Sequence, residues 1–168
     1  ALTLDDGWKN QRLALPILRA LGFKTSFAVF PGLGIGWDYF EWGDVKEIDA
    51  EPLFEVFSHT MSHPWDVKEN LVTWIDGRGS KYDESNVLYE LEESKRVLEA
   101  KLGRPVEYLA WPAGWYNDAL IRHAAAAGYR GLFTIEPGVN LPGGDVQRIK
   151  RIMVDGRCTM KQFEEILT

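Results

Sequence analysis

The sequence predicts an α/β domain built on a parallel sheet or barrel, and three observations support this. Short apolar runs rich in β-branched and aromatic residues alternate with segments of helical spacing. A chain of 168 residues can bury one substantial core, and its 45% apolar and 26% charged content is ordinary for a globular protein. Strands that alternate with helices form parallel sheets whose sites lie at the carboxyl ends of the strands. We therefore expect residues 1–168 to form a single domain.

The elements are predicted in chain order. The first strand, 1–4, is followed by a helix over 10–21 that should kink at Pro16 and stop at Gly22. Asp83 or Ser85 can cap the strongest helix, which Gly103 ends. Two stretches that are glycine-rich or lack a period, 31–44 and 65–82, are predicted loops. The remaining predictions are strands at 24–30, 53–57, 106–111, 130–134 and 149–154, and helices at 45–50, 84–102, 118–127 and 160–167.

Composition excludes several classes of protein. The net charge of −6 argues against a nucleic-acid partner, because phosphate backbones attract basic surfaces. The single Cys158 excludes an internal disulfide and a cysteine-based zinc site. No apolar run of about 18 residues and no signal-peptide pattern occurs, so no membrane span is predicted. Because the chain opens within a strand pattern, a periplasmic, cell-surface or secreted location is expected if a leader precedes this stretch.

The first strand ends in two adjacent carboxylates, Asp5 and Asp6, followed by Gly7. Successive side chains of a strand leave opposite faces, so both can enter one pocket only if the backbone turns, which Gly7 permits. His59 and His63 follow another predicted strand, and either a helical or a looped backbone can bring both imidazoles to one ion. The alternatives without a catalytic role are a turn or helix cap for the aspartates and solvated loop positions for the histidines.

Taken together, these residues predict a catalytic metal site. One carboxylate and two imidazoles supply three ligands and leave a fourth position open, which is typical of a catalytic rather than a structural zinc site. The second carboxylate then remains outside the metal shell and can act as general base on a water that the ion activates.

At these residues the chain resembles the NodB-homology polysaccharide deacetylases, carbohydrate esterase family 4. The family's Thr-Phe-Asp-Asp-Gly stands here as Thr3-Leu4-Asp5-Asp6-Gly7, and its His-Ser/Thr-x-x-His as His59-Thr60-Met61-Ser62-His63. The resemblance implies an incomplete seven-stranded (β/α) barrel. It also implies site roles: Asp5 as general base, a divalent metal, usually Zn²⁺ with Co²⁺ or Ni²⁺ as alternatives, on Asp6, His59 and His63, and Thr60 as support of the histidine loop.

The later motifs of the family are altered. Arg-x-Pro-Tyr-Gly corresponds to residues 110–114, where Ala110 and Ala113 replace arginine and tyrosine. The resemblance implies that this arginine normally orients the catalytic aspartate through a further acidic residue. Ala113 can still donate its backbone N–H to an oxyanion. Trp111-Pro112-Ala113-Gly114 is similar to the Trp-Pro-x-Gly of the poly-β-1,6-N-acetylglucosamine deacetylase branch. In the family, a histidine after the last strand supplies the general acid, and at that place this chain has Asp155. The alternatives for the general acid are a histidine upstream of Ala1 or the metal-bound water.

Aromatic residues near the motifs are candidates for sugar contacts. The chain holds seven tryptophans, and indole faces stack on the apolar faces of sugar rings. The predicted substrate-binding side chains are Trp8, Trp65 and Trp115, with Trp111 and Pro112 beside the oxyanion site. Packing in the core or loops is the alternative for each tryptophan.

The predicted function is metal-dependent removal of acetyl groups from an oligo- or polysaccharide, N-acetyl more than O-acetyl. Two other classes fit parts of the pattern. A carbohydrate-binding relic would explain the altered motifs, and a non-haem iron oxygenase would use two histidines and a carboxylate as its facial triad. The oxygenase leaves Asp5 without a role.

Overall fold

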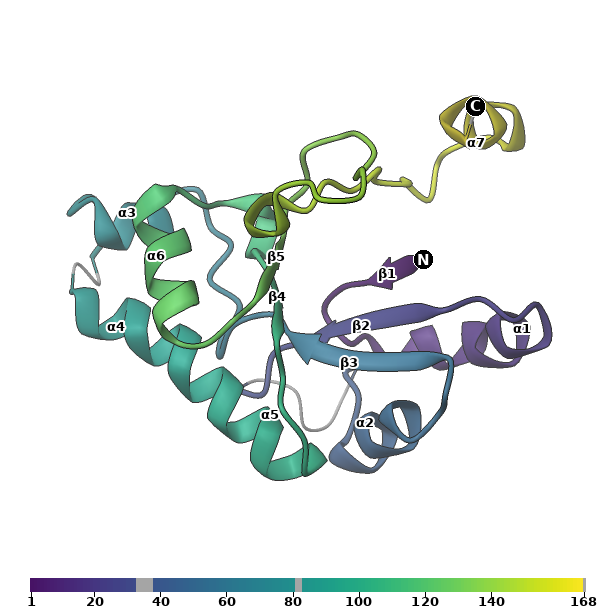
Figure 1. Ribbon diagram of the computed structural model, residues 1–168, viewed down its shortest axis with the longest axis horizontal. Coiled ribbons are helices and arrows are strands. Elements are labelled where there is room, and N and C mark those ends of the chain that lie inside the picture. The colour runs from purple at the N-terminus through teal and green to yellow at the C-terminus, as the bar shows by residue number, and fades with distance from the viewer. Residues whose placement is uncertain (33–37, 81–82, 168) are drawn as a thin grey trace.

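Five parallel strands form one sheet in the order β1-β2-β3-β4-β5 in the computed structural model, which describes residues 1–32, 38–80 and 83–167 (Figure 1). Leu2 on β1 pairs with Thr25 on β2, and Thr25 pairs with Phe54 on β3. Most residues of β2 and β3 are buried, as expected for a parallel sheet covered on both faces. The strands span Leu2–Leu4, Thr25–Val29, Phe54–Ser58, Tyr108–Ala110 and Gly131–Phe133.

The sheet is curled into a half-barrel. β1 and β5 are its two edge strands. Arg151 comes after β5 in the chain, and it donates hydrogen bonds to Thr3 and Asp5 at the end of β1. Ile149 makes a single parallel bridge to Phe133 before the chain reaches Arg151. The carboxyl ends of all five strands therefore face a common rim.

The helices cover the outside of this sheet, and α2 and α5 pack against β3. A 3₁₀ segment, Lys9–Ala14, leads into α1, and the change falls beside Pro16, where the kink was expected. Asp83 caps α4, and Gly103, with φ 71°, ends α5. The helices span Leu15–Ala20 (α1), Trp42–Asp49 (α2), Leu71–Ile75 (α3), Glu84–Leu88 (α4), Ser94–Leu102 (α5), Asp118–Ala126 (α6) and Met160–Leu167 (α7).

Three predicted elements need correction. α3 lies inside the predicted loop 65–82, because Asn70 and Thr73 form a capping box that starts a helix too short to show a period. α2 begins three residues before the predicted helix, where Glu41 and Asp44 cap it. Instead of a strand at 149–154, the chain makes only the bridge at Ile149. Residues 33–37 and 81–82 of the predicted loops lie outside the described residues.

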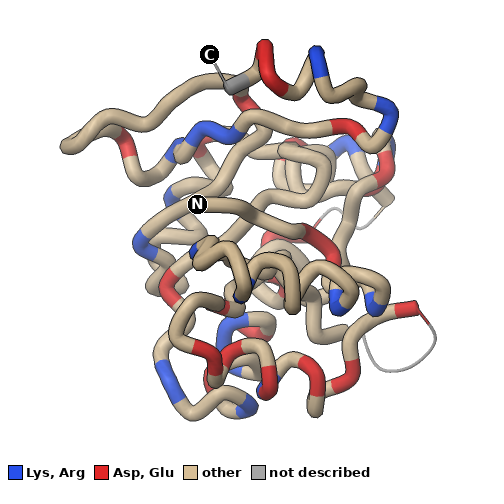
Figure 2. The backbone as a smooth tube through the Cα atoms, turned by 90° about the vertical axis from the view of Figure 1, so that its right-hand side faces the viewer, with Lys and Arg blue, Asp and Glu red and all other residues tan. Residues whose placement is uncertain are grey.

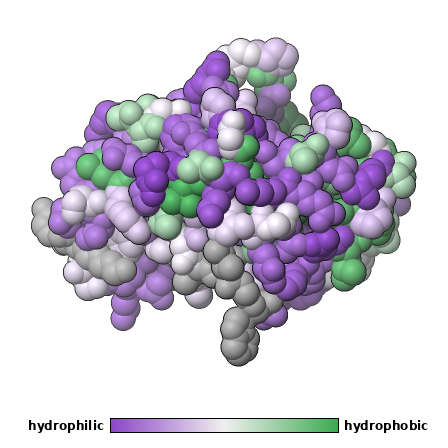
Figure 3. All heavy atoms as spheres, turned by 90° about the horizontal axis from the view of Figure 1, so that it is seen from below, coloured by the Kyte–Doolittle hydropathy of each residue, from purple (hydrophilic) through white to green (hydrophobic). Residues whose placement is uncertain are grey.

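A π-helical turn, Tyr89–Glu93, interrupts the predicted helix 84–102 between α4 and α5. The core lies between the sheet and its helices and includes Phe27, Phe57, Leu109 and Leu132, all with at most 1% of their surface exposed. Polar residues cover most of the face seen in Figure 3, with small apolar patches between them.

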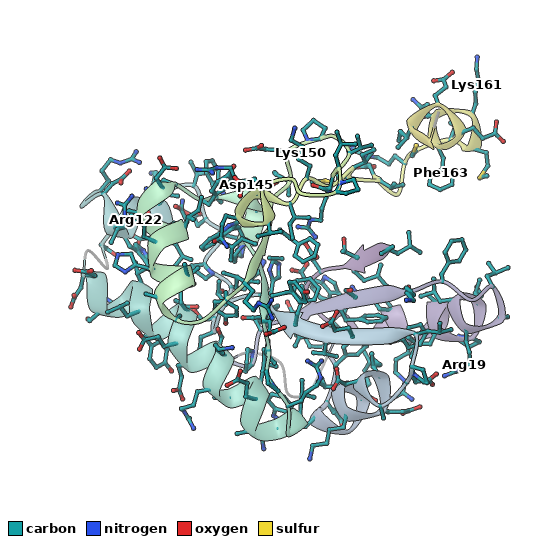
Figure 4. The ribbon with its side chains drawn as sticks, viewed as in Figure 1. Arg19, Arg122, Asp145, Lys150, Lys161 and Phe163 are labelled. Carbon is teal, nitrogen blue, oxygen red and sulfur yellow. The ribbon has the colours of Figure 1, made fainter. Side chains whose placement is uncertain are left out.

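Charges of both signs are interspersed along the backbone (Figure 2). The last helix, α7, stands away from the sheet, with Lys161 pointing outward (Figure 4). None of the helices within the described residues is both long and apolar enough to cross a membrane.

Candidate metal centre and its surroundings

Three loops at the carboxyl ends of β1, β3 and β4 build the site. Each contains a non-glycine residue with a left-handed backbone, at φ values of 74°, 67°, 56° and 50° for Asp6, Thr60, His63 and Ala113. Within the described residues these are all the non-glycine residues with positive φ. Such conformations are unfavourable and concentrate at functional sites, where the surrounding structure enforces them. The backbone strain of this chain therefore lies in the loops that carry the predicted motifs.

Asp6, His59 and His63 converge, as the sequence predicts. Oδ1 of Asp6 lies 3.3 Å from Nε2 of His59 and 3.2 Å from Nε2 of His63. One ligand atom from each residue lies within 4.8 Å of the other two. One carboxylate oxygen and two imidazole nitrogens this close together suit a divalent ion.

The surroundings of the three side chains also fit a metal. Nδ1 of His59 lies 2.8 Å from the carbonyl oxygen of Ala110, so this nitrogen carries the proton and leaves the lone pair of Nε2 free to coordinate. The indole N–H of Trp8 donates to Oδ2 of Asp6 at 3.0 Å and leaves Oδ1 for the ion. Burial opposes ionisation of Asp6, but contacts with the protonated forms of His59 and His63 outweigh it and hold the pKa of Asp6 well below its usual range; a bound cation would take the place of those protons at Nε2. The donor set is therefore charged and oriented for a cation.

Asp5 lies beside this centre but is held separately. Its Oδ1 accepts a hydrogen bond from Nη1 of Arg151 at 2.7 Å, and its carbonyl oxygen accepts one from the Gln11 side chain at 2.6 Å. Arg151 also donates from Nε to the carbonyl of Thr134 at 2.7 Å, and only 13% of its side chain is exposed. The guanidinium therefore fixes the Asp5 carboxylate from the opposite edge of the sheet.

The third loop, after β4, brings Ala113 to the rim. It forms a 3₁₀ turn, Pro112–Gly114, in which Ala113 is exposed and left-handed. Trp111 and Pro112 are buried, and the Trp111 indole is fully enclosed, so it supports the loop from below and offers no surface to a sugar. Trp115, 40% exposed, follows the turn.

The other two candidate tryptophans each lie near one of the metal ligands, Trp8 beside Asp6 and Trp65 in a groove with His63. Trp8 is 39% exposed, and one indole face stacks on Tyr39 with 4.5 Å between ring centroids. Trp65 is 63% exposed and lines an open groove with His63, Glu69 and Trp74. Thr60 is buried, and its hydroxyl accepts a hydrogen bond from the backbone N–H of His63 at 3.2 Å.

Asp155 belongs to the segment between the bridge at Ile149 and α7; Figure 1 shows this segment leading away from the sheet to α7. Its two carboxylate oxygens accept hydrogen bonds from Nε and Nη2 of Arg157 at 2.8 and 2.9 Å. These bonds lower the pKa of Asp155. A general acid must hold a proton near neutral pH, so this pairing is unfavourable for the predicted role.

Sequence reasoning missed two residues that support the site. Arg151 stands inside a segment predicted to be a strand, and no spacing in the sequence connects it with Asp5. Glu90, in the π-helical turn, accepts hydrogen bonds from the backbone N–H groups of Met61 and Ser62, and it stands three residues after the buried Val87, a spacing that helical periodicity assigns to the same face. The spacing from Val87 is therefore a signal for Glu90, whereas no local pattern marks Arg151, whose side chain is 13% exposed.

Comparisons with known proteins agree with this arrangement. A family model described as polysaccharide deacetylase matches residues 1–132. YxkH of Bacillus subtilis (strain 168) is 23% identical over 154 residues, which are 91% of this chain and 50% of that protein. The poly-beta-1,6-N-acetyl-D-glucosamine N-deacetylase of Escherichia coli (strain K12) is 23% identical over 198 aligned residues, covering 99% of this chain and 29% of that protein. The chain thus spans half or less of these relatives.

Solved structures share the fold. The deacetylase PplD of Streptococcus pyogenes in complex with acetate has a TM-score of 0.80 at 21% identity, covering 99% of this chain and 69% of that chain. IcaB from Ammonifex degensii has a TM-score of 0.80 at 24% identity, covering 98% and 70%. BA3943 of Bacillus anthracis, described as a CE4 family pseudoenzyme, has a TM-score of 0.57 at 20% identity, covering 79% and 41%.

Proposed function

Because the chain belongs to the polysaccharide deacetylase family, we propose that it is a metal-dependent hydrolase that removes N-acetyl groups from a polymer containing N-acetylglucosamine. One observation carries the proposal: Asp6 faces both histidines while its neighbour Asp5 is kept apart by Arg151. The two adjacent carboxylates thus have different surroundings, as a ligand and a base require. The poly-beta-1,6-N-acetyl-D-glucosamine deacetylase among the relatives supports the choice of polymer.

Asp6, His59 and His63 would hold the ion, which supplies Lewis acidity that activates a water and polarises the acetyl carbonyl. Asp5 takes a proton from the attacking water, and Arg151 keeps the Asp5 carboxylate in one orientation during this transfer. The N–H of Ala113 donates to the developing oxyanion.

The proton must finally reach the sugar nitrogen as acetate leaves. We propose that Asp5 passes on the proton it has taken, because it already carries that proton beside the reacting atoms, whereas the Asp155 side chain is 56% exposed and pairs with Arg157 in the segment that leads to α7. One carboxylate then serves as base in the attack and as acid in the collapse, which yields the amine and acetic acid; acetic acid gives its remaining proton to the amine or to solvent and leaves as acetate. Trp65 and Trp115, both exposed beside the loops, are proposed to stack on sugar rings.

The test is acetate release from N-acetylglucosamine oligomers, with acetylated xylan as the O-acetyl alternative, after loading with Zn²⁺, Co²⁺ or Ni²⁺. Asp5→Asn should abolish release while retaining bound metal, because the amide cannot accept the proton. Full activity of Asp5→Asn would overturn the assignment of the base.

Two results would replace the proposal. Sugar binding without acetate release under every metal would favour a carbohydrate-binding relic, an outcome given weight by a pseudoenzyme with the same fold. Oxygen-dependent turnover with iron would favour an oxygenase.

A further inference from the structure

The π-helical turn Tyr89–Glu93 places a carboxylate where charged residues are rarely found. Glu90 and Leu91, three and four residues after the buried Val87, both face inward, with exposed fractions of 4% and 0%. Buried glutamates occur almost only when they are paired, and π-helical turns within α-helices are frequent at functional sites. Glu90 therefore needs partners that justify its position.

These partners belong to the loop that connects the two histidine ligands. Oε2 of Glu90 accepts hydrogen bonds from the backbone N–H groups of Met61 and Ser62, both at 2.8 Å. Its Oε1 accepts a hydrogen bond from the Ser62 hydroxyl at 2.5 Å. Hydrogen bonds to an ionised acceptor are about twice as strong as neutral ones. Three such hydrogen bonds thus join the Glu90 carboxylate to Met61 and Ser62, the two residues that precede His63.

A second chain of hydrogen bonds joins the same turn to the start of the loop. The carbonyl oxygen of Leu91 accepts hydrogen bonds from the hydroxyls of Ser94 and Tyr129, each at 3.0 Å. The Ser94 hydroxyl lies 3.0 Å from that of Ser58, whose oxygen accepts the N–H of Thr60 at 3.2 Å. The turn therefore holds the loop both before and after Met61.

The loop requires this support because Thr60 and His63 have left-handed backbones. On its other side, the N–H of Gly32 donates to the carbonyl of Met61 at 2.7 Å, and a Cβ at Gly32 would lie 2.4 Å from that oxygen. Met61 is thus clamped between Gly32 and Glu90. A loop freed from Glu90 could relax its backbone, and Nε2 of His63 would then leave its position beside Asp6.

We propose that the π-helical turn fixes the metal-binding loop, and that Glu90 is the positioning residue that sets the affinity of the Asp6–His59–His63 centre for its ion. This inference rests on the proposed function only in treating these three residues as a metal site. It makes no use of the sugar or of the acetyl transfer to water.

The experiment measures Co²⁺ affinity and the visible absorption of the Co²⁺-loaded protein in Glu90→Ala, Glu90→Gln and Ser62→Ala. Glu92→Gln, on an exposed residue of the same turn, is the matched control. We expect Glu90→Ala to bind Co²⁺ about 10- to 100-fold more weakly, as for other residues that orient metal ligands. Glu90→Gln should fall in between, because its amide oxygen can still accept both N–H groups while its NH₂ replaces the acceptor of the Ser62 hydroxyl.

Circular dichroism of the metal-free proteins monitors folding. If Glu90→Ala fails to fold, Glu90→Gln and Ser62→Ala test the proposal instead, because both retain most of the contacts between Glu90 and the loop. The proposal is overturned if these two variants match Glu92→Gln in Co²⁺ affinity and absorption spectrum. If their affinities fall but the wild-type protein releases no acetate, the positioning role stands and the deacetylase proposal fails.

Discussion

Replacing Arg151 by methionine tests how the general base is held. The guanidinium makes three hydrogen bonds, to Asp5, Thr3 and the carbonyl of Thr134, and it lies over the ring of Phe133 with 5.9 Å to the ring centroid. Methionine keeps much of the aliphatic length over that ring but removes every donor. The Asp5 carboxylate then loses the bond that fixes its orientation toward the water.

The expected loss follows from the strength of that bond. A hydrogen bond involving a charged group contributes about 1.5–3 kcal/mol. The Arg151 and Asp5 side chains are 13% and 30% exposed, so solvent screens the pair only in part. If this energy is lost from the transition state, kcat falls about 10- to 100-fold, at about 1.4 kcal/mol for each factor of ten. The contacts of Arg151 are to the protein itself, so KM should change little.

Steady-state kinetics of acetate release from N-acetylglucosamine oligomers provides the measurement. Arg151→Lys should recover part of kcat, because one ammonium group cannot reach both Asp5 and the Thr134 carbonyl as the planar guanidinium does. Added guanidinium should partly rescue Arg151→Met, which a purely structural role would not allow. Arg157→Met is the control, since this exposed arginine pairs with Asp155. A folded Arg151→Met with wild-type kcat would refute the reasoning.

Two further predictions follow from the site's surroundings. Asp155→Asn should retain acetate release within about twofold, because Arg157 already lowers the pKa of Asp155; a loss as deep as that of Asp5→Asn would identify Asp155 as the acid. Burial raises the pKa of Tyr129 to about 12, so the folded state keeps a proton that the unfolded state releases near pH 10. The free energy of unfolding should therefore fall by about 2–3 kcal/mol between pH 10 and 12, and Tyr129→Phe should flatten this decline in denaturant titrations; an unchanged slope would contradict it.

The parts of the site that the sequence predicted share one property: each is local in the chain. Asp5 and Asp6 stand together, and three residues separate His59 from His63, so both pairs are visible as spacings at the ends of apolar runs. The alternation of strands and helices likewise predicted a parallel sheet. Local patterns did not reveal α3, whose five residues are too few to show a period.

The missed contacts depend on geometry that spacing cannot express. A π-helical turn has no sequence period of its own, and the residues that donate to Glu90, Met61 and Ser62, lie 29 and 28 positions away in the chain. Similarly, the 149–154 run has the composition of a strand, but Ile152, Met153 and Val154 are 44–65% exposed. Its one inward charged residue, Arg151, acquires a function only once the sheet curls and brings its edges together.

The location of Arg151 bears on how the altered motifs can support catalysis. The family model matches residues 1–132, so the arginine that contacts Asp5 comes from outside the matched region. Where the related motif has an arginine, Ala110 instead offers its carbonyl oxygen to His59. The β4 loop thus retains a role at the metal centre, while the base is held from the segment after β5. The Asp5 carboxylate needs a hydrogen-bond donor at one place in space, and an arginine from a different position in the chain can supply that donor. Loss of the motif arginine is therefore compatible with an active site, and the Arg151 variants distinguish such a replacement from a relic.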